Sequence, residues 1–542
     1  MANITIDGKQ YTVKDGITII EAIDQTKGSD VPRYCYHPGL SIAGNCRVCQ
    51  VEVEKMPRTV IACNTTVAEG MVIHTQSEKA KVSQKTVLEF LLANHPLDCP
   101  VCDQAGECKL QDYYMEYGTY DPKFNENKVK KTKKAVAIGP TINLDQERCV
   151  LCSRCVRFTD EITKTHEFGI FERGDHAKVD VYSELNNKYS GNVADICPVG
   201  ALTDKDFRFK MRVWYLGKQK SVCPGCSRGC NISIETEKNR PYHLKKERVM
   251  RLKPVENPDV NQWWMCDDGR YAYKSIDAGR IEKVQIRKDG KLVETTWETA
   301  LAAAGQMLTA AAASAGRWAL ITSPQHTNEE LFLQKKFFKD VLKIEKTAYS
   351  WSFDHGYEDN FLIKADKNPN TAGAEEILGA SGDIAQVLEA AKRGDLDGLI
   401  IFGRDLAKYG ADTLAALRSK IKTILYVGVN TNATSEAADL VLPGASYAEV
   451  DGTFTNYQGR VQRIRKSIEP LQDARPIWKI VQDLAAGQGI VWKNKRSEDI
   501  FAAIAGESAA FTGLTYASLE PHGKIWSGKT CVEAAPTCVG AK

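Results

Sequence analysis

Cysteine placement constrains this sequence more than any other feature. Fifteen of the seventeen cysteines of the 542-residue chain lie between Cys35 and Cys266. The opening MANITIDGKQ lacks the basic and apolar regions of a secretory signal, so we expect a reducing compartment. Grouped cysteines there are more often metal ligands or catalytic groups than disulfides. Because the length also exceeds one hydrophobic core, we expect several domains, the earlier ones organised around ligand sets.

The overall charge does not select a partner. The 72 basic and 69 acidic side chains leave a net charge of +3, so composition indicates neither nucleic acid nor a membrane surface. No run of 18 apolar residues occurs, and we expect no membrane span. The basic run from Lys128 to Lys134 is interpreted as a solvated linker, with contact to an acidic partner as the alternative.

The first ligand set follows the spacing C-x10-C-x2-C-x13-C and comprises Cys35, Cys46, Cys49 and Cys63. A plant-type [2Fe–2S] site also takes three cysteines from one loop and a fourth from further along, although its first gap is shorter. Gly39 and Gly44 would let backbone amides approach the sulfurs. Zinc is the alternative, but zinc sites usually pair two short C-x2-C knuckles.

The second set, HPLDCPVCDQAGEC, supplies only three thiolates, Cys99, Cys102 and Cys108. A [4Fe–4S] cluster needs four protein ligands, and no unassigned cysteine is nearby. His95, four residues before Cys99, is therefore predicted to be the fourth ligand, although a lone histidine is usually structural. A neutral imidazole in place of a thiolate would ease reduction of the cluster.

The third and fourth sets each combine a cysteine triplet with a remote cysteine. ERCVLCSRCVRF is typical of a [4Fe–4S] site, and the Cys-Pro of DICPVGAL completes it. SVCPGCSRGC is completed by the next cysteine, in WWMCDDGR. The two sets are Cys149, Cys152, Cys155 and Cys197, and Cys223, Cys226, Cys230 and Cys266.

The number of candidate ligands matches the number that four clusters need. Fifteen cysteines and His95 complete four sets, and only Cys531 and Cys538 remain, which we interpret as unliganded thiols. We find no G-x-G-x-x-G after a strand, no P-loop and no convincing nucleophile arrangement. The sequence predicts a carrier of single electrons whose donor and acceptor belong to other subunits.

Local patterns predict the elements around these sets. NITIDG and QYTVKDG indicate a hairpin, residues 17–26 a helix, residues 49–54 and 58–67 strands, and residues 77–94 an amphipathic helix that ends at His95. In the second half, residues 318–323, 398–403 and 423–430 resemble buried parallel strands. Helical patterns at 297–313 and 328–342 stand before and after the first of them, and this alternation favours an open α/β sheet.

The motif order resembles that of the large iron–sulfur subunits, the G-subunits, of NADH–quinone oxidoreductases (respiratory complex I). The resemblance implies a multidomain α/β chain: a [2Fe–2S] ferredoxin-like (β-grasp) domain at 1–78, a His(Cys)3 [4Fe–4S] domain at 79–118 and a ferredoxin-like [4Fe–4S] domain at 140–214. A [4Fe–4S] domain of the type found in molybdenum and tungsten enzymes follows at 215–272. The segment from Ala433 to Pro470, with GTFTN and GRVQ, resembles molybdopterin oxidoreductases, so 273–542 is interpreted as a truncated domain of that kind.

Function is inferred from the same resemblance. It implies one [2Fe–2S] and three [4Fe–4S] clusters relaying electrons in a proton-translocating NADH:quinone oxidoreductase. Electrons would pass from the Cys35 set to the Cys149 set and then to the His95 set, with the Cys223 set off the path. The implied partners are a flavin- and NADH-binding subunit, a thioredoxin-like [2Fe–2S] subunit and a two-cluster ferredoxin-like subunit. The implied location is the cytoplasmic side of the bacterial inner membrane, held there only through the complex.

Two other functions stay open at this point. The chain could serve an NAD-coupled formate dehydrogenase or hydrogenase as its electron-transfer subunit. No cysteine lies between Cys266 and Cys531 to bind molybdenum, and none remains for a hydrogenase cluster, so we expect no molybdopterin. A zinc-binding interaction protein is the third possibility; a colourless preparation would identify it.

Overall fold

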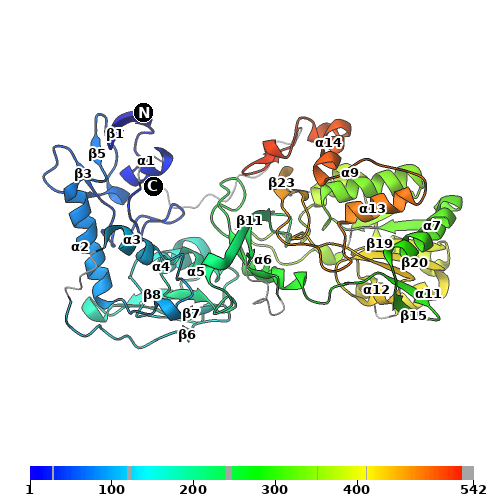
Figure 1. The fold of residues 1–542 in the computed structure, drawn as a ribbon, viewed down its shortest axis with the longest axis horizontal. Helices are drawn as coiled ribbons and strands as arrows, with labels where there is room; N and C mark the ends of the chain where they lie inside the picture. Colours follow the sequence, from blue (N-terminus) through cyan, green and yellow to red (C-terminus); the bar gives the residue numbers. More distant parts are fainter. Residues whose placement is uncertain (27–29, 119–123, 239–246, 351, 411, 528–542) are drawn as a thin grey trace. The chain divides into compact units, whose positions relative to one another are not determined.

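The computed structural model describes residues 1–26, 30–118, 124–238, 247–350, 352–410 and 412–527 (Figure 1). The chain divides into two compact units, one covering residues 1–216 and the other beginning at Gly217. Cys531 and Cys538 lie outside the described residues. Among the described residues, no helix is long and apolar enough to span a bilayer.

The first unit begins with a small mixed sheet, in the strand order β2-β1-β5-β3-β4. The predicted hairpin is β1 (Ala2–Ile6) and β2 (Lys9–Val13), and β1 also pairs in parallel with β5 (Val72–His74). Helix α1 (Ile19–Thr26) buries its isoleucines against the sheet. The strand expected at 49–54 is β3 (Gln50–Val53).

The strand predicted at 58–67 is much shorter than expected. Within this segment only β4 (Val60–Ile61) is a strand, paired with β3, and a 3-10 turn follows at Ala62–Asn64. The turn satisfies the backbone locally, since Ala62 N donates to Cys49 O. It also carries Cys63 back to the other cysteines of its set, so the ligand shell ends the strand.

Two helices flank the second ligand set. Helix α2 (Glu78–Asn94) begins where the Ser77 side chain accepts a hydrogen bond from Ala80 N, and it ends at His95 as predicted. Helix α3 (Lys109–Tyr117) follows Cys108. The basic run is a solvent-exposed loop, as predicted for a linker, but it also contacts the fold: Lys128 donates to Leu92 O and Ala93 O at the end of α2, and Lys134 pairs with Asp98 at 2.7 Å.

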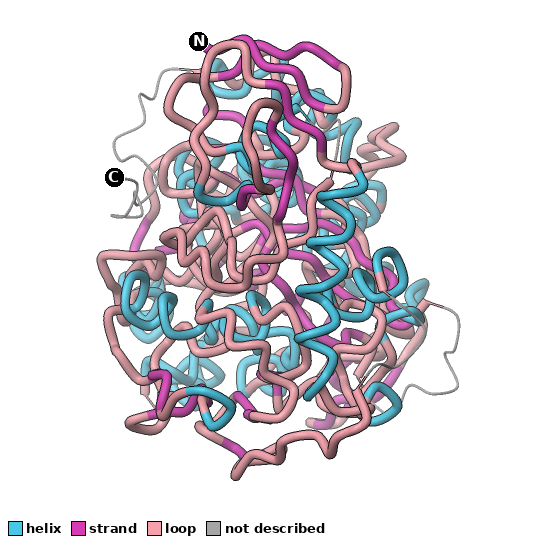
Figure 2. Tube along the Cα trace, turned by 90° about the vertical axis from the view of Figure 1, so that its left-hand side faces the viewer, coloured by secondary structure: helices cyan, strands magenta, loops and turns pink. Residues whose placement is uncertain are grey.

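Short elements surround the third ligand set. The order β10-β7-β6 gives a three-stranded sheet, and β8 and β9 form a separate hairpin. Figure 2 shows the long loops that connect the helices and strands of the chain. The bounds are β6 (Val136–Ala137), β7 (Ile142–Leu144), α4 (Arg154–Arg157), β8 (Phe168–Phe171), β9 (Lys178–Val181), α5 (Asn192–Ile196) and β10 (Leu202–Asp204).

The second unit starts with the fourth ligand set on a small antiparallel sheet. Strands β11 (Leu216–Val222), β12 (Asn231–Glu237) and β13 (Val249–Pro254) pair in chain order, and α6 (Asp267–Tyr271) follows Cys266. Cys223 and Cys230 belong to the same buried cluster as Ile232 and Ile234. The ligands are therefore built into a hydrophobic core.

An eight-stranded sheet dominates the rest of the unit, in the order β15-β14-β21-β20-β19-β16-β17-β18. The strands from β16 to β21 run parallel, and β14 and β15 form an antiparallel edge. Their bounds are β14 (Gln285–Lys288), β15 (Lys291–Glu294), β16 (Trp318–Ile321), β17 (Lys346–Ser350), β18 (Gly382–Asp383), β19 (Gly398–Phe402), β20 (Thr423–Gly428) and β21 (Leu440–Pro443).

Helices cover both faces of this sheet, as the alternation of core residues shows. Leu320 and Ile400 belong to one buried cluster with α7, α8, α13 and α14, whereas Ile321 and Ile401 belong to another with α10 and α11. The helices are α7 (Trp297–Ala313), α8 (Asn328–Gln334), α9 (Thr371–Leu378), α10 (Ile384–Arg393), α11 (Thr413–Lys420), α12 (Ala433–Ala437), α13 (Ile477–Ala486) and α14 (Ser497–Glu507).

The predicted architecture, a multidomain α/β chain ending in an open α/β sheet, is confirmed. The helix predicted at 328–342 differs in one respect, because it widens into a π-helical turn at Lys335–Val341. A third, small sheet contains the GTFTN and GRVQ landmarks: β22 (Gly452–Thr455) and β23 (Arg460–Ile464), with β24 (Lys524–Ile525) at its edge.

Candidate iron–sulfur sites

The four cysteines of the first set touch one another. The Cys35 thiol is hydrogen-bonded to Cys46 and Cys63, and Cys63 is hydrogen-bonded to Cys49. Cys35 N also approaches Cys46 Sγ at 3.5 Å. The hydrogen bonds from Cys46 and Cys63 hold the pKa of Cys35 far below its usual range, so the set readily carries a thiolate.

The third set surrounds a small cavity lined by Cys149, Cys152, Cys155 and Cys197. Leu151 and Ser153, between the triplet cysteines, have φ of 53° and 58°, and this left-handed backbone coils the loop around the cavity. Leu151 N approaches Cys149 Sγ at 3.4 Å. Burial raises the pKa of Cys197 to about 12. A coordinated metal would lower this pKa again, because it binds and stabilises the thiolate.

The fourth set lines a cavity of about 90 Å³. Gly269 N lies 3.3 Å from Cys266 Sγ, and a Cβ on Gly269 would stand 2.9 Å from Cys223 Sγ. Only glycine leaves the sulfur in place there. Backbone amides directed at the sulfurs are the kind of donor that stabilises a reduced iron–sulfur cluster.

The second set is the most open. Cys102 and Cys108 are buried, and Cys99 is exposed. Burial raises the pKa of Cys108 to about 11, and the charges of Cys102 and Cys99 add to this effect, so the three thiols lie close together. His95 is half-buried at the end of α2. Burial, followed by the charges of Arg148 and Lys128, lowers the pKa of His95 to about 4. The imidazole is therefore neutral, as a metal ligand must be.

An ion-pair network supports the second set. Arg148 donates to Asp98 Oδ2 at 3.0 and 3.1 Å, and Lys134 pairs with the same carboxylate. Burial lowers the pKa of Arg148, but the negative charges of the Cys102 thiolate, Asp145 and Asp98 raise it above its usual value. Arg148 is thus a shared neighbour of His95 and Cys102. No contact between His95 and the three thiols is among those described, so its role as a ligand stays a prediction.

The chemistry of these donors suits clusters. Within the described residues, no group of three or more His, Cys, Asp or Glu side chains is arranged to hold a single metal ion. The third and fourth sets instead enclose space between their thiols, and amide donors and glycines face the sulfurs. Buried thiols, amide donors and room between them fit an iron–sulfur cluster.

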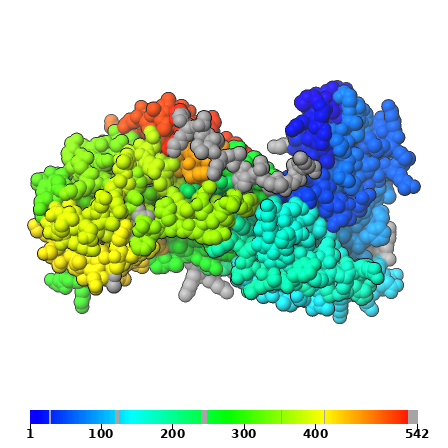
Figure 3. Space-filling view, turned by 180° about the vertical axis from the view of Figure 1, so that it is seen from behind, coloured from blue at the N-terminus to red at the C-terminus, as the bar shows by residue number. Residues whose placement is uncertain are grey.

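The three sets of the first unit adjoin one another. Burial is the main cause that raises the pKa of Cys152, and the charge of Cys35 adds to it. Burial likewise raises the pKa of Tyr34, and Cys108 and Cys46 contribute, so the first set neighbours both of the others. Gly200, three residues after Cys197, lies directly against Cys102 Sγ. In the space-filling view the blue and cyan residues of these domains form one continuous surface (Figure 3).

Sequence reasoning missed the residues between the sets. Tyr34 is fully buried and its hydroxyl has no hydrogen-bond partner among the described residues. Arg154 and Arg157 connect the first and third sets. The two arginines within CSRCVRF could have indicated this role, because cations next to a cysteine triplet in sequence lie close to its thiolates.

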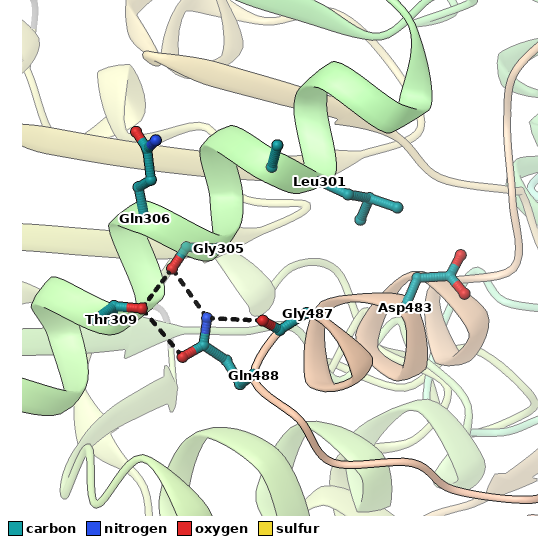
Figure 4. A pocket seen from close by; sticks show the side chains of 8 residues that line it. Leu301, Gly305, Gln306, Thr309, Asp483, Gly487 and Gln488 are labelled. Atoms are coloured by element: carbon teal, nitrogen blue, oxygen red, sulfur yellow. Dashed lines mark hydrogen bonds between the residues drawn. The ribbon is translucent and has the colours of Figure 1, made fainter.

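Besides the cavity of the Cys223 set, the described residues of the second unit line two further cavities. One, of about 270 Å³, lies at the carboxyl ends of β16, β19, β20 and β21, where open α/β sheets bind ligands; His326, Glu330 and Ser446 are in its wall. The other is a groove of about 670 Å³ between α7 and the end of α13 (Figure 4). Gln488 bonds to Gly305 O and Thr309 across the groove. These polar groups satisfy one another and leave an interhelical groove with no reactive constellation.

Known families match most of the chain. The matching models are described as a 2Fe-2S iron-sulfur cluster binding domain (1–78), the NADH-ubiquinone oxidoreductase-G iron-sulfur binding region (84–123), the NADH-quinone oxidoreductase subunit 3 ferredoxin-like domain (139–203), the molybdopterin oxidoreductase Fe4S4 domain (217–278) and molybdopterin oxidoreductase (366–487). The chain therefore contains [2Fe–2S] and [4Fe–4S] binding domains and part of a molybdopterin oxidoreductase domain.

Individual relatives agree with these models. The NADH-quinone oxidoreductase G-subunit of Rickettsia bellii is 31% identical, and the match covers 90% of this chain and 86% of the relative. The mitochondrial NADH-ubiquinone oxidoreductase 78 kDa subunit of Candida albicans is 30% identical over 89% of this chain and 82% of its own. The G-subunit of Rickettsia typhi is 42% identical over 56% of this chain and 43% of its own.

The cavity at the sheet edge does not fit a molybdopterin dinucleotide. The described residues that line it include no cysteine to bind molybdenum and no lysine or arginine to neutralise a diphosphate. Its 270 Å³ is also below the usual range for small-molecule pockets. The residues that line this cavity thus offer neither a thiolate nor a cation to such a cofactor.

Proposed function

The chain belongs to the G-subunit family of NADH-quinone oxidoreductases, and on this premise we propose that its four ligand sets hold one [2Fe–2S] and three [4Fe–4S] clusters. The chain is the electron-relaying iron–sulfur subunit of respiratory complex I, an oxidoreductase. In this proposal the [2Fe–2S] cluster is bound by Cys35, Cys46, Cys49 and Cys63. The [4Fe–4S] clusters are bound by His95, Cys99, Cys102 and Cys108; by Cys149, Cys152, Cys155 and Cys197; and by Cys223, Cys226, Cys230 and Cys266.

The observation that carries the proposal is the convergence of remote cysteines on their triplets, with Cys197 on the wall of the Cys149 cavity and Cys266 on that of the Cys223 cavity. Bound clusters supply one-electron uptake and release. The protein's own residues supply the thiolates, direct amides at the sulfurs and exclude water. The adjacency of the three sets in the first unit supports a relay among them.

Partners are proposed from the family. As a member of this family, the chain acts with other subunits of complex I. We propose that these are the flavin- and NADH-binding subunit, the thioredoxin-like [2Fe–2S] subunit and the two-cluster ferredoxin-like subunit. The proposed location is the cytoplasmic face of a bacterial inner membrane. The alternative, a subunit of a formate dehydrogenase or hydrogenase, has less support because the full-length relatives are complex I subunits.

Metal content tests the proposal directly. Anaerobically purified protein should contain about 14 irons per chain, two from one cluster and four from each of three, with no stoichiometric molybdenum or tungsten. Low-temperature EPR of the reduced protein should show one [2Fe–2S] signal among [4Fe–4S] signals. Zinc without iron would contradict the proposal, and stoichiometric molybdenum would make the chain an enzyme in its own right.

His95 is tested separately. His95→Ala should lose or degrade one [4Fe–4S] cluster, because the three remaining thiolates leave one iron without a protein ligand. His95→Cys should keep the cluster and lower its reduction potential, since a thiolate adds negative charge. Iron analysis and EPR-monitored redox titration distinguish the variants. Unchanged iron and spectra in His95→Ala would remove His95 from the ligand set.

A further inference from the structure

Arg157 joins two ligand sets through their backbones. Its Nη2 donates to Cys35 O at 2.6 Å and to Cys152 O at 3.2 Å. Its Nη1 donates to Ser41 O, and Nε donates to Ser153 Oγ at 3.3 Å. One planar guanidinium therefore contacts the main chain of a proposed [2Fe–2S] ligand and of a proposed [4Fe–4S] ligand.

Neighbouring contacts tie the same two loops together. Arg154 donates to Tyr36 O at 2.5 Å and to Ile196 O at 2.9 Å, the carbonyls that follow Cys35 and precede Cys197. Asn45 Nδ2 donates to Leu151 O at 3.2 Å. Several side chains thus fix this junction, but Arg157 alone among these three contacts the carbonyls of two ligand residues.

The junction is also positively charged. Burial raises the pKa of Cys152, and the charges of Arg154 and Arg157 oppose that effect, so both guanidiniums lie close to the thiol. Burial and then the same two arginines lower the pKa of His37 to about 3, which keeps this histidine neutral. Arg154 and Arg157 therefore both place positive charge beside this pair of sites, and Lys131 adds a further cation near Cys149.

We propose that Arg157 is a positioning residue that fixes the Cys35 loop against the Cys149–Cys155 loop for direct passage of one electron between their clusters and raises both reduction potentials. The inference rests on the proposed function. One site is oxidised by one electron and the other reduced by one, with no bond or proton changed. A nearby cation favours reduction because each reduced cluster carries one more negative charge.

The test uses the intact complex with Arg157→Gln and Arg157→Lys, and with Arg173→Gln as a control on an exposed arginine of the same unit. The readouts are reduction potentials from EPR-monitored titration and the magnetic relaxation that each reduced centre causes in the other. Arg157→Gln should lower the equilibrium constant for reducing each centre about tenfold, a shift of ~59 mV per electron. Arg157→Lys should restore the potentials but weaken the relaxation, because a single ammonium nitrogen cannot also keep the contacts that Nη1 and Nε make with Ser41 O and Ser153 Oγ.

Every outcome bears on a defined claim. Wild-type potentials and relaxation in Arg157→Gln would overturn the role of Arg157, as would a shift of one centre only. If Arg157→Gln loses iron, Arg157→Lys decides: weakened relaxation supports the proposal and wild-type relaxation overturns it. Absence of either signal from the unmodified protein would instead contradict the proposed function.

Discussion

Replacing Gly200 with alanine is expected to empty the His95 site, removing about four of about 14 irons while the other three sites stay filled. A Cβ on Gly200 would lie well under 3.0 Å from Cys102 Sγ, a separation that real Cβ atoms do not show. The same atom would lie 3.2 Å from Gln104 Cβ, so Cys102 has little room to retreat. Because Cys102 is one of only three thiols in its set, its displacement should be decisive.

Iron analysis and EPR of Gly200→Ala measure this effect. The matched control is Gly506→Ala in α14, where an added Cβ meets nothing within 4 Å. Alanine in a helix interior stabilises by ~0.5–1 kcal/mol relative to glycine, so the control should keep full iron. Full iron with an unchanged spectrum in Gly200→Ala would mean that Cys102 can move aside, or that it is not a ligand.

The ligand sets could be predicted from the sequence because iron–sulfur loops have characteristic cysteine spacings and each cluster needs four ligands. Cys197 and Cys266 could be assigned to their triplets only because every other cysteine of the first half had a set. The buried parallel strands were equally accessible, since both faces of β19 and β20 are covered and their sequences are continuously apolar.

The junctions between the sets were not accessible, because they depend on residues far apart in sequence. Arg157 and Cys35 are separated by 122 positions, and Gly200 and Cys102 by nearly a hundred. The spacing of cysteines within one motif does not indicate which other motif will lie beside it in the folded chain. The shortened β4 is a second example, since the ligand turn at Ala62–Asn64 ends the strand after Ile61 despite the strand preference of Thr65, Thr66 and Val67.

In the second unit, we expect the largest loss of folding stability from a substitution in a buried ion pair. Arg280 Nη2 and Nη1 donate to the two oxygens of Glu449 at 2.9 and 3.1 Å, and both side chains are 0% exposed. Arg248 also pairs with Glu449, at 2.7 Å. Glu449→Gln should destabilise the unit by about 3–5 kcal/mol, because it leaves the Arg280 charge buried without a counter-ion.

Hydrogen exchange of the β20 and β21 amides reports this loss within the full chain. Exchange should accelerate by roughly a hundredfold or more at pH 7, since 1.4 kcal/mol is a factor of ten. Asp397→Asn, which removes the surface pair of Arg317, is the control and should leave these amides protected. Equal protection in Glu449→Gln and the unmodified chain would show that Arg280 is satisfied by carbonyls such as Ile276 O.

The pH dependence gives an independent check of the same pair. Burial opposes ionisation of Glu449, but hydrogen bonds and charge from Arg280, assisted by Arg248, hold the pKa of this carboxyl below its usual value. A carboxyl with a depressed pKa stabilises the fold above its unfolded pKa, ~4.3, and loses that contribution as the pH falls through the folded value. The difference in free energy of unfolding between Glu449→Gln and the unmodified chain should therefore be constant from pH 8 to about 5 and become smaller only below about pH 4. A difference that vanishes already near pH 6 would show that Glu449 is protonated in the folded protein, and that the buried pair is not an ion pair.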